Sequence, residues 1–125
     1  MTLPLFANGS VVGDYTPLIK YLEEARKRKG EAHVDDVVPR GEDLEYVKKI
    51  VESGTVSLAE LLQILTNKFY SRVDGEVAKH VLETCRGVSY TEEEARIEIA
   101  KLLAGWCIEI CSTLGIVKLR PRWKM

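Results

Sequence analysis

Apolar residues recur at helical spacing along most of the chain. The clearest case follows Ser57, where five apolar side chains are spaced i, i+3, i+4, i+7 and i+11: Leu58, Leu61, Leu62, Leu65 and Phe69. Ser57 and Glu60 have the Ser-x-x-Glu spacing of a capping box, which predicts that a helix begins there. Similar spacing and end signals predict three further helices over about 16–29, 42–53 and 74–86.

The helix predicted over about 91–114 is the longest and the most apolar. Thr91 and Glu94 again have the spacing of a capping box at its start. Its polar positions form one narrow stripe: Glu94, Glu98, Lys101, Gly105, Glu109 and Ser112. Because the rest of its circumference is apolar, we expect this helix to run through the centre of the fold.

The two ends of the chain have patterns that predict strands. Near the start, the β-prone residues 3–6 and 10–13 flank an Asn-Gly pair, which favours the left-handed positions of a hairpin turn. Over residues 115–125, apolar and basic side chains alternate, so a strand there would carry all its cations on one face. Pro121 lacks an N–H group and would confine that strand to the edge of a sheet.

Residues 31–41 have no helical period and are interpreted as a loop, with a short strand at Val34–Val38. The sequence therefore predicts an α+β fold that is mostly α. Four to five helices are expected around a long central C-terminal helix, with a small antiparallel sheet made from an N-terminal hairpin and a C-terminal edge strand. No internal linker or repeat interrupts residues 1–125, which are expected to form a single globular domain.

Composition indicates the setting in which such a domain works. Apolar residues make up 46% and charged residues 30% of the chain, and no apolar stretch approaches the roughly 20 residues that span a bilayer. The first residues lack the basic and long apolar regions of a signal peptide, so a cytoplasmic location without membrane contact is expected. One Gln and two Asn against 14 Glu and 10 Lys are typical of hyperthermophile proteins and favour a thermophilic archaeal or viral source.

The net charge of −1 conceals an uneven distribution. Residues 115–125 hold four cations and no acid, which leaves 14 cations against 19 acids, a balance of −5, for residues 1–114. A basic segment on an acidic body favours an anionic partner. The candidate phosphate contacts are Lys118, Arg120, Arg122 and Lys124, with Trp123 as a stacking side chain and Arg26, Lys27, Arg28 and Lys29 as an extension of the same surface.

These features predict a non-enzymatic accessory protein that binds single-stranded DNA or RNA through its basic C-terminal strand. Two simpler explanations stay open. The alternating cations and Pro121 also suit an edge strand protected against pairing with another chain, and the Arg26–Lys29 run stands where a helix dipole favours cations. The alternative function is a subunit that pairs through its helices, as a homo-oligomer or within a larger protein complex.

The cysteines and histidines give little indication of catalysis. The sequence contains none of the common nucleotide-binding, hydrolase or zinc-protease motifs, so no catalytic residue, cofactor or resident metal is predicted. Cys107 and Cys111 share a helix face and are interpreted as core residues, with a disulfide across a two-fold axis or half of a zinc site as alternatives. His33, Asp35 and Asp36 could ligate a metal, but no second cluster at ligand spacing accompanies them.

Overall fold

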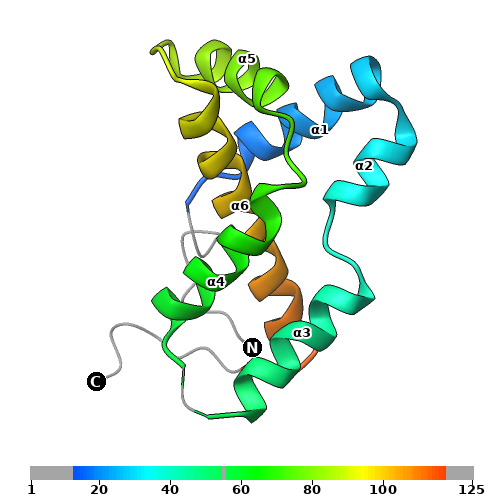
Figure 1. Ribbon diagram of the computed structural model, residues 1–125, viewed down its shortest axis with the longest axis vertical. Helices are drawn as coiled ribbons and strands as arrows, with labels where there is room; N and C mark the ends of the chain where they lie inside the picture. The colour runs from blue at the N-terminus through cyan, green and yellow to red at the C-terminus, as the bar shows by residue number, and fades with distance from the viewer. Residues whose placement is uncertain (1–12, 55, 118–125) are drawn as a thin grey trace.

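The computed structural model describes residues 13–54 and 56–117, which form helices gathered around one long helix (Figure 1). In chain order the helices are α1 (Thr16–Lys29), α2 (Glu31–Val37), α3 (Gly41–Glu52), α4 (Leu58–Tyr70), α5 (Gly75–Arg86) and α6 (Glu92–Thr113). In Figure 1, α1 and α5 lie toward the upper end of the long axis, α3 lies toward the lower end, and α6 passes between them.

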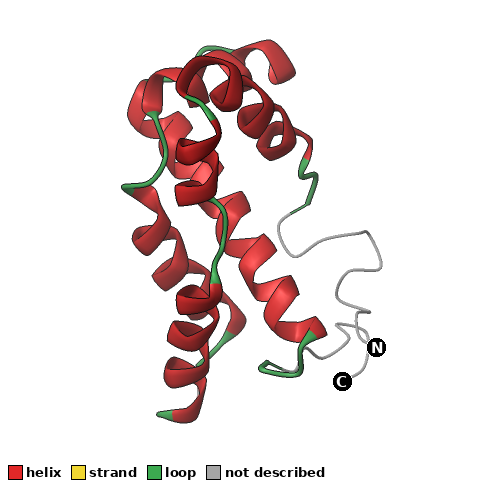
Figure 2. Ribbon diagram, turned by 90° about the vertical axis from the view of Figure 1, so that its right-hand side faces the viewer, coloured by secondary structure: helices red, strands yellow, loops and turns green. Residues whose placement is uncertain are grey.

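The predicted α+β fold class is wrong, because residues 13–54 and 56–117 contain helices and no strand (Figure 2). The two segments expected to build the small sheet, 1–12 and 118–125, lie outside the described residues. The short strand expected at Val34–Val38 is also wrong, since residues 31–37 form α2. Val34 and Val37 are both buried, and a helix places side chains three apart on one face, whereas a strand would turn them to opposite faces.

Two helix starts occur where the capping boxes predicted them. Ser57 Oγ accepts a hydrogen bond from the Glu60 N–H at 3.0 Å, and Glu60 Oε1 accepts one from the Ser57 N–H at 2.8 Å. Thr91 and Glu94 make the same reciprocal pair at 3.0 and 2.9 Å. Each box satisfies two backbone donors that the first helical turn would otherwise leave unpaired, so α4 and α6 begin at sharply defined positions.

The central position predicted for the last helix is confirmed. The buried residues of α6 surround most of its circumference: Ala95, Ile99, Ala100, Leu102, Leu103, Ala104, Gly105, Cys107, Ile108 and Cys111. Its main neighbours are α4 and α5, with α1 and α3 packed against it as well. The polar stripe is narrower than predicted, because Gly105 is buried and lies within the core rather than facing solvent.

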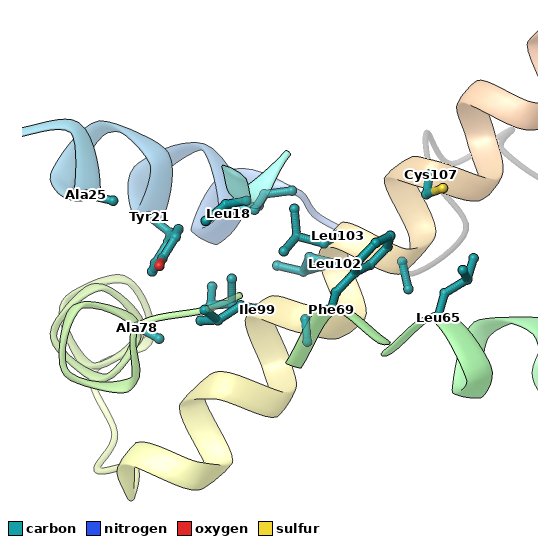
Figure 3. Close-up of a cluster of buried hydrophobic side chains, with 14 of the residues drawn as sticks. Leu18, Tyr21, Ala25, Leu65, Phe69, Ala78, Ile99, Leu102, Leu103 and Cys107 are labelled. Atoms are coloured by element: carbon teal, nitrogen blue, oxygen red, sulfur yellow. The ribbon is translucent and has the colours of Figure 1, made fainter. Parts of the chain in front are cut away.

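Large side chains from α1, α4 and α6 meet in the core (Figure 3). Phe69 of α4 lies toward Leu103 of α6, Leu65 of α4 lies on the Cys107 side of the cluster, and Tyr21 of α1 lies toward Ala78 of α5. All of these side chains are essentially removed from solvent, and burial of such apolar surface is the main force that holds the helices together. Among the described residues, no helix combines the length and apolarity that a membrane crossing requires.

Candidate nucleic-acid interface and buried polar clusters

The basic run Arg26–Lys29 forms the exposed last turn of α1. Three of its four cations have carboxylate partners, with N···O distances of 2.8 Å for Arg26–Glu31, 2.7 Å for Arg28–Glu24 and 3.0 Å for Lys29–Asp74. Much of the positive charge of this turn is therefore balanced by neighbouring acids. Within the described residues, Lys27 has no carboxylate within ion-pair distance, so it is the cation of the run most available to an anionic partner.

The fold places this run far from the point where the chain continues into its basic C-terminal segment. The last turn of α1 and the last turn of α6 lie toward opposite ends of the long axis (Figure 1). The remaining predicted contacts, Lys118, Arg120, Arg122, Trp123 and Lys124, lie outside the described residues. Their roles stay predictions, and a single surface that joins them to Arg26–Lys29 finds no support in residues 13–54 and 56–117.

Cys107 and Cys111 are buried in α6, as their interpretation as core residues predicted. Both are free thiols, and so is Cys85, which is exposed on α5. A hydrogen bond from the Cys107 thiol to the Cys111 sulfur, together with burial, raises the pKa of Cys107, and the same bond lowers the pKa of Cys111. Because both sulfurs are enclosed within one chain, a disulfide to a second chain would require this core to open.

The fold does not bring together the three candidate metal ligands His33, Asp35 and Asp36. His33 is half-buried against α1, with Nε2 3.1 Å from the Tyr21 hydroxyl oxygen, whereas Asp35 and Asp36 are exposed on α2. The helical conformation of residues 31–37 is the cause, because it turns neighbouring side chains to different faces. In the part of the chain that the structure describes, no three His, Cys, Asp or Glu side chains are grouped closely enough to hold a metal ion.

A buried ion cluster joins α3 to the connector that follows α4. The Asp43 side chain is completely enclosed, and its two oxygens accept hydrogen bonds from Arg72, from Nη1 at 2.9 Å and from Nη2 at 2.6 Å. Asp43 Oδ2 also accepts the Arg40 N–H at 2.8 Å, and Lys68 Nζ lies 3.8 Å from Oδ1. The Arg72 guanidinium lies over the Phe69 ring at 4.6 Å, which holds its plane in position for the two-bond contact.

The electrostatics of this cluster favour the ionised carboxylate. Burial opposes the charge on Asp43, but the hydrogen bonds from Arg72 and from the Arg40 N–H outweigh it and hold the pKa of Asp43 below its usual value. Arg72 is itself largely shielded, with 13% of its side-chain surface exposed. The two charges therefore depend on each other, because either one alone would be buried without compensation.

A second buried polar cluster is centred on the Tyr21 hydroxyl of α1. Its oxygen accepts the Asp74 N–H at 2.8 Å, which leaves its own proton available to His33 Nε2 on α2. The Asp74 carboxylate accepts the Val77 N–H at the start of α5 and pairs with Lys29 at 3.0 Å. Burial raises the pKa of Tyr21 to about 12, so the phenol is a neutral structural group at ordinary pH.

Arg96 of α6 contacts the C-terminal end of α4. Its Nη2 donates to the Tyr70 carbonyl oxygen at 3.2 Å, and its guanidinium carbon lies 4.2 Å from the centre of the Tyr70 ring. A cation at the C-terminal end of a helix is favoured by the helix dipole. The connector 71–74 is thus held by Asp43 through Arg72, by Tyr21 through Asp74, and by Arg96 at the last turn before it.

Neither cluster has the geometry of an active site. Tyr21 and Asp43 are enclosed by protein, and each polar group faces a partner that satisfies it. An open hollow of about 410 Å³ is lined by Tyr46, Ile64, Asn67 and Lys68. These four side chains include an amide and an ammonium group but no nucleophile with a neighbouring base, so the hollow has no arrangement suited to covalent catalysis.

Both clusters were missed in the sequence. Asp43 is the third residue of α3, where an acid is common, but the residue at the cap is Arg40 rather than Ser or Thr, so no capping-box pattern appears. Tyr21 lies within the buried stripe of α1, at helical spacing from Leu18 and Ala25, so its sequence position is that of an ordinary core residue and gives no sign of its polar contacts. Their partners lie 29 and 53 residues away in sequence, a separation that local patterns do not encode.

Comparisons with known proteins give no further information, because no protein family, no curated protein and no solved structure matches this chain significantly.

Proposed function

We propose that this chain is a non-enzymatic accessory protein of the cytoplasm that binds single-stranded DNA or RNA through its basic C-terminal segment. The single observation that carries the proposal is the charge division between residues 115–125, with four cations and no acid, and the remaining chain, with a balance of −5. Cations that contact phosphates supply most of the affinity of sequence-independent binding, and an adjacent Trp can stack on a base.

The described helices support a revised set of contacts. Lys118, Arg120, Arg122 and Lys124 are the proposed phosphate contacts, with Trp123 as the proposed stacking side chain. Arg26, Arg28 and Lys29 are no longer proposed as main phosphate contacts, because each already pairs with a carboxylate of the fold. In this proposal the helical body is a stable carrier that repels nucleic acid elsewhere through its acidic surface.

The alternative function, assembly through helix pairing, has lost the two observations that suggested it. The broad apolar surface of α6 is covered by other helices of the same chain, and its two cysteines are enclosed. Exposed large apolar side chains such as Ile19, Val88 and Ile97 stand on different elements, as isolated ones often do on monomeric proteins. We therefore propose nucleic acid, rather than a second copy, as the principal partner.

A salt-dependent titration tests the proposal. Fluorescein-labelled single-stranded DNA and RNA of mixed sequence are titrated with protein at about 50 and 200 mM salt, where phosphate contacts weaken strongly with salt. Replacing Lys118, Arg120, Arg122 and Lys124 together by Ala should abolish most of the affinity at low salt. It should also reduce the slope of the logarithm of the binding constant against the logarithm of the salt concentration by roughly 3, because each of the four single-strand phosphate contacts contributes about 0.7.

The matched control removes the same four charges elsewhere on the exposed surface: Lys20, Lys48, Lys49 and Lys101, each replaced by Ala. This variant should keep most of the affinity and the original salt slope. Trp123→Ala should weaken binding by about 1–3 kcal/mol if the indole stacks on a base. Equal losses in the two four-charge variants, or no binding by the unmodified chain at low salt, would refute the proposal.

A further inference from the structure

The attachment of α3 to the rest of the protein is unusually polar. Its fully buried side chains are Asp43 and Val47, so one of the two is a carboxylate. Leu44, Ile50 and Val51 are only partly buried, and α3 packs mainly against α6. By contrast, α5 buries four apolar side chains, namely Val77, Ala78, Val81 and Leu82. The hold on α3 therefore depends strongly on the Asp43–Arg72 ion pair.

A buried ion pair with two hydrogen bonds tolerates little displacement of its partners. Its two parallel hydrogen bonds form only when α3 is seated, because the carboxylate and the guanidinium must be coplanar and in register. When the pair separates, both charges must leave their enclosed positions and reach water together. Partial displacement of α3 is consequently unfavourable, and the helix is expected to be either seated or fully detached.

The part of α6 that lies beside α3 contains two buried thiols. Helix α3 packs against α6 at the level of its later half, which is the part of α6 that carries Cys107 and Cys111 (Figure 1). Cys107 and Cys111 are completely enclosed, whereas Cys85 on α5 is exposed. The three cysteines thus report on two regions of the molecule: two lie near the seat of α3, and the third lies on a helix that packs on α6 and α1 instead.

We propose that α3 is a detachable cover on α6, held closed by the Asp43–Arg72 pair, and that its opening exposes Cys107 and Cys111 while α1, α5 and the first half of α6 stay folded. The cover makes the reactivity of the two thiols conditional on one ion pair. This proposal is independent of nucleic-acid binding, since it concerns only the described helices.

The test is alkylation of the native protein with iodoacetamide, followed by mass spectrometry of each cysteine, together with amide hydrogen exchange and urea unfolding of the same samples. Cys85 should react at once in every variant and serves as the internal standard. In the unmodified protein, Cys107 and Cys111 should react faster than the global unfolding equilibrium allows, and the amides of α3 should exchange faster than those of α5.

Asp43→Asn removes the charge that holds the cover and should raise the alkylation rates of Cys107 and Cys111 by about 10-fold or more. Glu24→Gln is the matched control, because it also removes one carboxylate from an ion pair, the exposed Arg28–Glu24 pair on α1. It should leave both rates within about 2-fold, as surface pairs contribute little. Arg72→Lys keeps the positive charge but loses the two-bond geometry, and it should raise both rates less than Asp43→Asn does.

Two results would overturn the proposal. One is that alkylation of Cys107 and Cys111 and exchange of the α3 amides follow the global unfolding equilibrium in the unmodified protein and in both cluster variants. The other is that Asp43→Asn and Arg72→Lys both unfold the whole chain, with loss of protection in α5, because the ion pair would then hold the entire fold rather than a separate cover.

Discussion

Asp43 and Arg72, which are 29 residues apart in sequence, form a two-bond ion pair in the interior, with Nη1–Oδ2 and Nη2–Oδ1 distances of 2.9 and 2.6 Å. The pair fixes α3 to the connector between α4 and α5. The same connector supplies the Asp74 N–H that the Tyr21 hydroxyl accepts, so α1 and α3 are both anchored to one short segment. The arrangement of the helices thus depends on a few polar contacts in addition to the apolar core.

The interdependence of the two charges gives the first prediction. Arg72→Met leaves the Asp43 carboxylate enclosed without its main partner and should lower the free energy of unfolding by about 3–5 kcal/mol. The double variant Asp43→Asn with Arg72→Met removes both charges and should be more stable than the sum of the single effects predicts, by about 0.5–3 kcal/mol. Urea unfolding of the four proteins measures this coupling.

The same cycle on the exposed Arg28–Glu24 pair of α1 supplies the reference, since exposed helix pairs typically contribute about 0.3–0.5 kcal/mol. If the Asp43–Arg72 coupling is no larger than the coupling of the surface pair, the buried cluster does not have the energetic role assigned to it.

Acid should destabilise the protein through the same carboxylate. The pKa of Asp43 is held below its usual 3.8, so the folded state binds its proton less readily than the unfolded state does. Its contribution to stability is fully present above that unfolded value and is lost as the pH falls through the lower folded value. Urea unfolding at a series of pH values from about 6 to 2 should show a steeper loss for the unmodified protein than for Asp43→Asn. Equal slopes would contradict this assignment.

The sequence predicted the local features of the fold and missed those that depend on distant partners. The capping boxes at Ser57 and Thr91 placed two helix starts because both bonded groups lie within four residues. The apolar breadth of residues 91–114 predicted their central position, since periodicity directly reflects burial. Residues 31–37 were misinterpreted because Asp and Val are weak helix formers, and packing against α1 overrides that preference.

The candidate site was less predictable than the helices. The run Arg26–Lys29 has the composition of a phosphate surface, and the sequence gives no sign that Glu31 and Asp74 would neutralise part of it. Asp74 is distant in sequence, and its position beside Lys29 follows from the packing of α5 on α1. Whether the cations of a charge run are free to bind phosphate therefore depends on which acids the surrounding helices bring beside them. An uneven distribution of net charge along the chain, by contrast, can be counted from the sequence itself.

Removal of one hydroxyl should weaken the contacts among α1, α2 and α5. Tyr21→Phe keeps the buried ring but leaves the Asp74 N–H without its acceptor and His33 Nε2 without its partner. We expect the free energy of unfolding to fall by about 1–3 kcal/mol, the usual cost of an unsatisfied buried polar group. Tyr46→Phe is the control, because this ring is 39% exposed, and the change should stay within about 0.5 kcal/mol.

The same substitution should change the alkaline limit of stability. Burial raises the pKa of Tyr21 to about 12 in the folded state, against 10.0 for the free side chain. The unfolded chain therefore loses this proton first, and stability that is fully present below pH 10.0 is lost as the pH rises toward 12. At about 1.4 kcal/mol per pKa unit, this loss is roughly 2–3 kcal/mol. Unfolding measured from about pH 9 to 12 should show a shallower decline in Tyr21→Phe, and equal declines would contradict the assignment.

Two glycines at equivalent helix positions should respond oppositely to the same substitution. Gly41 and Gly75 are the first residues of α3 and α5, and neither has a positive φ. A Cβ on Gly41 would meet no atom within 4 Å, so Gly41→Ala should stabilise the protein by about 0.4–1 kcal/mol through the reduced freedom of the unfolded chain. A Cβ on Gly75 would lie 3.0 Å from Arg96 Cδ and 3.2 Å from Glu92 Cβ.

Arg96 cannot retreat from that added carbon without giving up its contacts with the Tyr70 carbonyl and ring. Gly75→Ala should therefore destabilise the protein by about 1–3 kcal/mol, the usual cost of an overpacked contact. Arg96→Ala removes the obstructing side chain, so the added cost of Gly75→Ala should fall sharply in that background. Thermal or urea unfolding of the single and double variants measures these differences. If Gly75→Ala is as well tolerated as Gly41→Ala, the close approach of α5 to Arg96 does not constrain the fold.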